Sequence, residues 1–186
     1  HHRRRSGQVK DLADWSIRPA RAVEAQRISD LVNSVYRGTT GLRSWTSEAS
    51  FIAGQRTDVE RIHEIMNQPH RIILVTQVRV GIAGCVSVDV SERIGHFGML
   101  SVGVPFQKSG MAKALIRAAE SWAANQGASE MRLQVLMNRP ELISYYERQG
   151  YRMTEERIPF PNGEPRFGEP LIDGLMFGTM SRPISN

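Results

Sequence analysis

The chain has 186 residues, of which 40% are hydrophobic and 23% charged, and its formal net charge is +5. The length fits one domain with a sizeable core, and the composition is ordinary for a soluble globular protein. No segment approaches the roughly 18 apolar residues that cross a membrane, so no membrane partner is expected. The single cysteine, Cys85, excludes an internal disulfide and favours a reducing, cytoplasmic setting. The positive charge permits an anionic ligand, but the arginines are scattered, so nucleic-acid binding is not expected.

The N-terminal segment is expected to stand apart from the fold. His1-His2-Arg3-Arg4-Arg5 has no apolar segment behind it and therefore does not resemble a signal peptide. We expect residues 1–12 to form a disordered tail or a tag remnant. Residues 13–186 contain neither a repeat nor a linker, which predicts a single domain.

The first half of the chain begins with helical periodicity. Apolar residues recur at i, i+3, i+4 and i+7 from Ile28 to Val35, which is one face of a helix. A second helix is expected to stop before Pro69. In chain order, the patterns predict a strand over 15–18, a helix over 21–36, a Gly-, Ser- and Thr-rich loop over 38–50 and a helix over 57–66.

The pattern then changes to the alternation of strands, interrupted by two further helices. Gly95, Gly98 and Gly103 lie in one of these strands and predict a bulge or a close approach to the backbone. The predicted elements are strands over 72–76, 80–90 and 94–104, a helix over 111–126, a strand over 131–135, a helix over 140–149 and strands over 151–158 and 175–180. This order predicts an α/β fold with a mixed sheet, in which one βαβ unit makes a right-handed crossover.

The stretch Gln107 to Ala112, "QKSGMA", precedes the longest predicted helix. The first turn of a helix has unpaired N–H groups and the positive end of the dipole, and a glycine there lets a phosphate approach. Taken alone, the stretch also fits a plain helix start capped by Ser109. It matches neither the dinucleotide fingerprint nor the P-loop.

In its context the stretch resembles the signature Q/R-x-x-G-x-G/A of the GCN5-related N-acetyltransferase (GNAT) family. It follows the glycine-marked strand "GMLSVGVPF", and a second family element is matched by "MRLQVLMNRPELISYYERQGY", Met131 to Tyr151. The resemblance covers residues from Ser16 to the C-terminus. It implies the GNAT fold, with a mostly antiparallel sheet of about seven strands, splayed at a bulged strand and flanked by about four helices.

The resemblance further implies that the chain binds acetyl-CoA and transfers its acetyl group to a primary amine, which attacks directly in a ternary complex. Main-chain groups of the bulged strand would pair with the pantetheine arm. The residues that the resemblance assigns to acetyl-CoA are Leu100, Ser101, Val102 and Val104 on the strand, Gln107, Lys108, Ser109, Gly110, Met111 and Ala112 around the pyrophosphate, and Asn138, Arg139 and Tyr146. Two departures from the pattern are Pro105, which stands two residues before Gln107, and Ala112 in place of a second glycine. Asn138 also fits an N-cap, with Glu141 three residues later.

Tyr146, in "YERQGY", is the expected catalytic acid, since it matches a tyrosine that lies near the CoA sulfur in many relatives. A phenol can protonate the leaving thiolate. The alternative is that Tyr146 only packs against the cofactor or the core. Tyr145 would point about 100° away on the helix and is expected to be core.

His96, on the strand before the bulge, is the candidate base for deprotonating the amine, since histidine has a reference pKa near 6.5. A structural histidine is the competing interpretation. Asp89 and Glu92 are weaker rivals, and the amine could also lose its proton to water. Cys85 lies among alternating apolar residues and is expected to be a buried, structural thiol.

The acceptor is left open by the sequence. Loops around Trp45 and over 159–170 are expected to build its pocket, and a small-molecule or peptide amine could occupy it. An acidic pocket would favour a polyamine or an aminoglycoside, and a basic pocket an amino acid with a free carboxylate. No metal is expected, because no histidine has a partner at ligand spacing. The chain is expected to be a monomer or homodimer, and the competing function is an inactive sensor that binds CoA or acetyl-CoA.

Overall fold

The computed structural model describes residues 14–38, 47–161 and 165–185. The expected tail over 1–12 and Trp45 lie outside this range. The strands are β1 (Ser16–Pro19), β2 (Ile52–Ala53), β3 (Arg71–Val78), β4 (Gly81–Ser91), β5 (Ile94–Val102), β6 (Glu130–Leu136), β7 (Arg152–Pro159), β8 (Glu169–Pro170) and β9 (Met176–Pro183). The α-helices are α2 (Ala25–Arg37), α3 (Val59–Met66), α4 (Met111–Asn125) and α5 (Pro140–Arg148), and the 3-10 turns are η1 (Ala22–Glu24), η2 (Val104–Phe106) and η3 (Pro165–Phe167).

Seven strands form the central sheet, in the order β1-β3-β4-β5-β6-β9-β7. Every neighbouring pair of strands in this described sheet is antiparallel except β5 and β6, which α4 connects as a crossover. This confirms the predicted fold class and the parallel βαβ unit. The strands β2 and β8 form a separate small sheet, which the sequence patterns did not predict.

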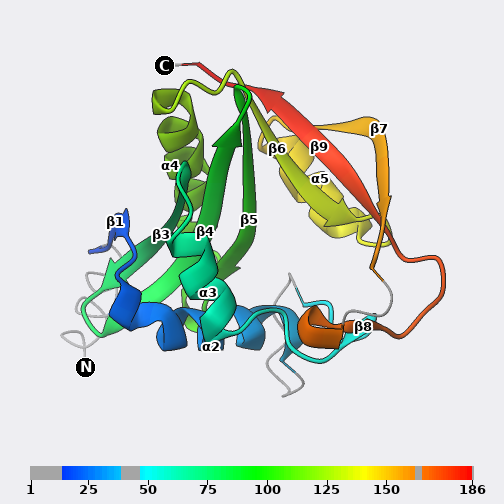
Figure 1. The fold of residues 1–186 in the computed structure, drawn as a ribbon, viewed down its shortest axis with the longest axis horizontal. Helices are drawn as coiled ribbons and strands as arrows, with labels where there is room; N and C mark the ends of the chain where they lie inside the picture. Colours follow the sequence, from blue (N-terminus) through cyan, green and yellow to red (C-terminus); the bar gives the residue numbers. More distant parts are fainter. Residues whose placement is uncertain (1–13, 39–46, 162–164, 186) are drawn as a thin grey trace, which may run out of the picture.

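The sheet splays between β5 and β6. Their parallel pairing is confined to Ile94–His96 on β5 and Glu130–Arg132 on β6, and Figure 1 shows the two strands diverging from there. Beyond the pairing, β5 carries an extra residue relative to β4, since Cys85 pairs with Ser101 while Ser87 pairs with Gly98. Met99 in this bulge has a φ of 53°, which is the left-handed region. The bulge that the strand glycines predicted is therefore present, next to Gly98.

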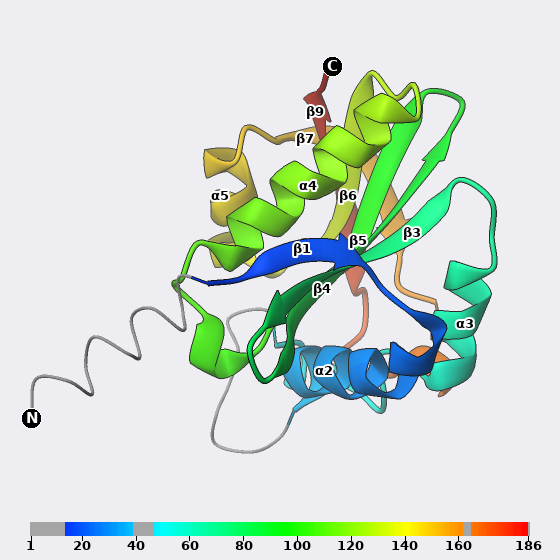
Figure 2. The same cartoon turned by 90° about the vertical axis from the view of Figure 1, so that its left-hand side faces the viewer.

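Helices cover both faces of the sheet. The core between α4, α5 and the sheet contains Leu115, Ile116 and Val88, and the core on the other face joins α2 and α3 to Ile73 and Val75. Figure 2 shows α4 and α2 on opposite sides of the strands. No helix in the described part of the chain is long and apolar enough to cross a membrane.

Gly95 explains how closely α4 approaches the sheet. A Cβ at this position would lie 3.0 Å from the Cβ of Ala123 on α4 and 3.1 Å from the sulfur of Met131. Both distances are shorter than ordinary van der Waals contacts, so only glycine leaves room for the helix here.

The structure differs from the sequence expectations at three points near strand and helix ends. The strand expected over 94–104 ends at Val102, and Val104 lies in η2 instead. Gly110, with a φ of 84°, occupies the N-cap position of α4, where Ser109 was the simpler expectation. The capping role considered for Asn138 is wrong, because α5 begins at Pro140 with Arg139 at the N-cap and no side-chain cap.

Candidate functional site

A cavity of about 570 Å³ opens where β5 and β6 diverge. Its floor consists of the bulged part of β5, from Phe97 to Leu100, and of Leu133 and Gln134 on β6. The walls include residues from α2, α3, β3, β4, α5, β9 and η3, and from the segments after α2, before α3 and after β7. Three of the residues predicted for the site line this cavity: His96, Leu100 and Tyr146.

Tyr146 reaches the cavity from α5 and is 5% exposed. Its ring packs against Phe97, Tyr145 and Tyr151, with ring centroids 5.5 to 6.4 Å apart. Burial raises the pKa of the phenol well above its ordinary value, and the nearby phenols of Tyr36 and Tyr145 add to the effect. Tyr146 therefore keeps its proton. Tyr145 was expected to be core but is only partly buried, at the edge of the same cluster.

A second tyrosine fixes the bulge from the other side. Tyr36, at the end of α2, donates a hydrogen bond of 3.0 Å from its hydroxyl to the carbonyl oxygen of Leu100. The guanidinium of Arg56 lies over the Tyr36 ring, 5.5 Å from its centroid. Burial raises the pKa of Tyr36 as well, so this hydroxyl is a permanent donor. Sequence analysis did not single out Tyr36, which looked like the last turn of an amphipathic helix.

We expect Tyr36→Phe to lower the free energy of unfolding by about 1 kcal/mol, because it removes one hydrogen bond to a carbonyl at the bulge. The measurement is urea unfolding, in which the midpoint should fall while the slope of the free energy against urea stays the same. An unchanged midpoint would show that the bulge holds its shape without this bond.

His96 and Asp89 form a pair on the wall of the cavity. They are directly opposite each other on β5 and β4, and the Nδ1 atom of His96 lies 4.0 Å from Oδ2 of Asp89. Arg71 on β3 is opposite Asp89 in turn, so the three side chains form a row across three strands on one face of the sheet. Glu92, the other acid considered as a base, is exposed in the turn after β4 and does not line the cavity.

The Gln107–Ala112 loop lies beside the end of β5 and outside the lining of the cavity. Lys108, with a φ of 66°, and Gly110 both have left-handed backbone conformations, which turn the chain into α4. Ser109 accepts a hydrogen bond from the amide of Met111, and Gln107 donates one to the carbonyl oxygen of Val102. The next amides of the first turn, at Ala112 and Lys113, precede the first intrahelical bond, which Ala114 makes to Gly110.

The remaining predicted residues have different surroundings. Ser101 and Val102 are buried on β5, and Ser101 donates its hydroxyl hydrogen to the carbonyl oxygen of Met99. Asn138 is exposed on the turn before α5. Arg139 is buried, and its guanidinium binds Glu141 and the carbonyl oxygen of Ser47. This arginine therefore joins α5 to the segment after α2.

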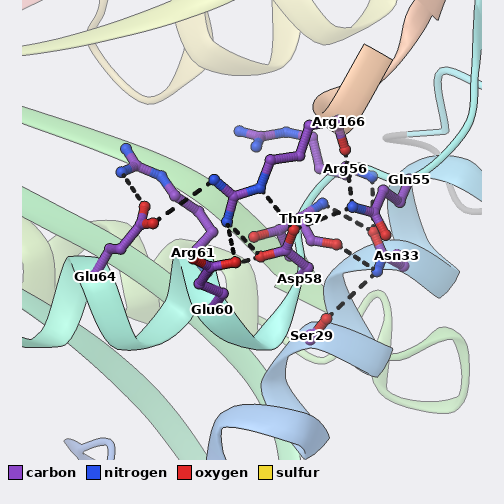
Figure 3. A network of polar contacts seen from close by, with 10 residues as sticks. All are labelled: Ser29, Asn33, Gln55, Arg56, Thr57, Asp58, Glu60, Arg61, Glu64 and Arg166. Atoms are coloured by element: carbon purple, nitrogen blue, oxygen red, sulfur yellow. Dashed lines mark hydrogen bonds and ion pairs between the residues drawn. The ribbon is translucent and has the colours of Figure 1, made fainter. Parts of the chain in front are cut away.

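A small second layer, formed by the segment after β2 and the turn η3, closes the cavity on the side away from α4. Arg37, whose side chain is 5% exposed, pairs with Glu48 and donates to the carbonyl oxygens of Gly54, Gln55 and Phe167. Figure 3 shows Arg166 reaching from η3 toward α3, where its guanidinium lies 2.8 Å from Asp58. This hydrogen bonding lowers the pKa of Asp58 to about 2. The contacts hold Phe167 at the wall of the cavity.

Cys85 is fully buried on β4, with its sulfur 3.6 Å from the carbonyl oxygen of Met99. Burial raises the pKa of its thiol to about 12. The expectation of a buried thiol is thus confirmed, and a thiolate nucleophile at this position is disfavoured. In the residues that the structure describes, no three metal-ligating side chains converge.

A splayed, mostly antiparallel sheet with a bulged strand and a glycine-containing loop before the crossover helix defines the acetyltransferase class of α/β folds. The chain belongs to the acetyltransferase (GNAT) family, whose model matches residues 39–151, more than half of its length. No curated protein sequence matches the chain significantly.

Solved structures agree with this assignment at the level of the fold. The ribosomal-protein-alanine N-acetyltransferase from Brucella melitensis has a TM-score of 0.67 at 15% identity, over 91% of this chain and 99% of that one. The ribosomal-protein-S18-alanine N-acetyltransferase from Escherichia coli has a TM-score of 0.66 at 13% identity, over 93% and 96%. A phosphinothricin acetyltransferase from Sinorhizobium meliloti, solved in complex with AcCoA, has a TM-score of 0.61 at 14% identity, over 92% and 89%.

Proposed function

We propose that this protein transfers an acetyl group from acetyl-CoA to a primary amine, which attacks directly in a ternary complex. The observation that carries the proposal is the cavity at the divergence of β5 and β6, where the pair His96–Asp89 and the protonated Tyr146 line one space beside the bulge. Family membership supports acetyl transfer in general.

The Gln107–Ala112 loop fits a pyrophosphate. Gly110 is exposed, and a Cβ built on it would meet nothing within 4 Å, so an anion can approach the backbone from that side. The amides at the start of α4 and the positive end of the helix dipole favour an anion there, and the exposed Lys108 adds a positive charge. Leu100, Ser101 and Val102 would pair with the pantetheine arm through the main chain, as an added strand does. When bound, acetyl-CoA supplies an activated acetyl thioester.

In the proposed reaction, His96 acts on the proton of the amine and Tyr146 acts on the leaving sulfur. His96 accepts a proton from the amine, directly or through a water, and Asp89 stabilises the resulting imidazolium. Tyr146 donates a hydrogen bond to the sulfur of the leaving group. The ordinary pKa of a phenol, about 10, is already above the reference value of about 8.5 for a thiol, and burial raises the pKa of Tyr146 further. Complete proton transfer to the sulfur is therefore uphill, and the hydrogen bond acts chiefly by stabilising the thiolate as the C–S bond breaks. The thiolate takes its proton from water after it leaves.

The test is to mix the protein with acetyl-CoA and a panel of primary amines and to measure free thiol. Thiol release that depends on both the amine and the protein supports the proposal. Calorimetric binding of acetyl-CoA with no thiol release for any amine would support the alternative of a CoA-binding sensor and overturn the enzyme.

We expect Gly110→Ala to raise the KM for acetyl-CoA about tenfold. The added methyl group would occupy the side from which the anion approaches the backbone, and the loss of one hydrogen bond to a charged group corresponds to that factor. The matched control is Gly127→Ala at the other end of α4, since Gly127 has a φ of 93° and equally open space around a Cβ. Both variants carry the same backbone strain, so a difference in KM reports on the ligand. Equal KM values in the two variants would show that this loop does not bind the pyrophosphate.

A further inference from the structure

Arginines dominate the charged lining of the cavity. Arg37, Arg56, Arg61 and Arg71 line it, against the two carboxylates Glu48 and Asp89. Arg37 is saturated, since it pairs with Glu48 and donates to three carbonyl oxygens of the second layer. The other three arginines come from the segment before α3, from α3 itself and from the start of β3.

Arg56 is the least neutralised of the three. Its backbone amide donates to the side-chain oxygen of Asn33, which anchors the segment before α3. Its guanidinium lies over the ring of Tyr36, whose hydroxyl donates to the carbonyl oxygen of Leu100. Within the described ranges, no carboxylate is within ion-pair distance of this guanidinium.

Arg71 keeps an unused donor. Its Nη1 atom donates to the side chain of Gln68, but its Nε atom is buried and has no hydrogen-bond partner in the part of the chain that is described. Burial, together with the nearby positive charge of Arg61, lowers the pKa of Arg71, while Asp89 acts in the opposite direction. Arg61 pairs with Glu64, which lies 3.6 Å from Arg166 as well and is therefore shared. An additional anion would relieve both the unpaired donor and the like charges.

The row of Arg71, Asp89 and His96 on the sheet indicates where such an anion would bind. Arg71 and His96 are two strands apart, with Asp89 between them, so their backbones are separated by about 10 Å. The arginine end of the row suits an oxyanion, because the guanidinium fork matches a carboxylate. The Asp89–His96 end suits an ammonium group before it loses its proton. The site is therefore complementary to a small molecule that carries both charges.

We propose that the acceptor is a small primary amine that also carries a carboxylate, and that Arg71, with Arg61 and Arg56, binds this carboxylate. The inference rests on the proposed function and specifies its substrate class. A polyamine acceptor would place additional positive charge against three arginines and is disfavoured by the same geometry.

The experiment compares matched acceptors at saturating acetyl-CoA. For each of a set of amino acids that differ in side chain, thiol release is measured with the free acid, its carboxamide and the corresponding decarboxylated amine. One hydrogen bond to a charged group corresponds to about 10- to 100-fold, so the best free acid should exceed its carboxamide in kcat/KM by at least tenfold. Turnover of neutral amines with no preference for the free acid would overturn the inference and leave the acetyltransferase intact.

Substitutions test which residues produce the preference for the free acid over its carboxamide. Arg71→Gln and Arg56→Gln should each reduce the ratio of kcat/KM for the free acid to that for the carboxamide by about tenfold. Arg152→Gln, on the exposed part of β7 away from the cavity, should leave the ratio unchanged. A rise in the KM for acetyl-CoA in place of the change in ratio would assign the arginines to the phosphates of the donor and overturn the inference.

Binding measurements separate failure of the inference from failure of the proposed function. If no amine releases thiol, the proposed function is wrong, and calorimetry with the free acid and its carboxamide in the presence of CoA then decides about the carboxylate. Tighter binding of the free acid, weakened by Arg71→Gln and unchanged by Arg152→Gln, would support the anion site. Equal binding of the two ligands would overturn it.

Discussion

Replacing Glu120 with alanine is expected to lower the free energy of unfolding by about 3 to 5 kcal/mol, the largest loss that we expect from a single substitution. Glu120 lies on α4 and is only 7% exposed. It accepts a hydrogen bond of 2.6 Å from the hydroxyl of Tyr151 and bonds of 2.7 Å and 2.9 Å from Arg117 and Arg182. One carboxylate thus joins the crossover helix to the residue before β7 and to β9.

The expected loss is large because three side chains lose the same acceptor at once, although Arg117 keeps its hydrogen bonds to Gln149. The hydroxyl of Tyr151, which is 1% exposed as a residue, would lose its acceptor, and Arg117 and Arg182 would face each other without a carboxylate between them. Neither arginine is fully buried, so water can replace part of what each loses. The hydroxyl of Tyr151 has no comparable exposure.

The measurement is denaturant unfolding monitored by far-UV circular dichroism, with the slope against denaturant checked for a two-state transition. Glu147→Ala on α5 is the matched control, since Glu147 is an exposed helical glutamate. Its effect should stay within about 0.5 kcal/mol. A loss below about 1 kcal/mol for Glu120→Ala would mean that the tyrosine and the arginines find other partners, and that the network contributes little to stability.

The sequence predicts those parts of the fold that follow from local periodicity. The run from Ile28 to Val35 and the residues around α4 have apolar faces that identify their helices, and the glycines around Gly98 indicate the bulge. The β2–β8 pairing joins two-residue strands more than a hundred positions apart, each too short to show a period. No local pattern identifies such a pair, so the sequence predicts a loop at residues 169–170 and makes no prediction for residues 52–53.

The sequence predicted three residues of the cavity lining, His96, Leu100 and Tyr146, each from its place in a pattern that resembles the family. The role of the loop before α4 follows from the same resemblance and stays a prediction. Arg56, Arg61 and Arg71 look like ordinary surface arginines in the sequence, and only the packing of α3 on β3 turns them toward one cavity. Glu120 likewise has the sequence context of a solvated helix face, and its burial depends on contacts with Tyr151, just before β7, and with Arg182 on β9.

We expect Tyr146→Phe to lower kcat about 100-fold, the lower end of the range for a group that assists proton transfer or stabilises a leaving group. The KM for acetyl-CoA should change much less, because the ring keeps its contacts with Phe97 and Tyr151. Since burial raises the pKa of Tyr146 well above its ordinary value, the phenol stays protonated at every pH below about 10. The factor between wild type and variant should therefore be constant from about pH 6 to pH 9.

Tyr145→Phe provides the comparison, because Tyr145 precedes Tyr146 on α5 but does not line the cavity. Its kcat should stay within about twofold of the wild type. The size of the loss in kcat distinguishes a donor from a packing residue. Because the phenol stays protonated, loss of the donor should lower the height of the pH profile of kcat and leave its shape unchanged. If Tyr146→Phe kept the full kcat, the leaving thiolate would be stabilised by other groups, such as the amides of the bulge, and Tyr146 would serve only to close the core beneath the cavity.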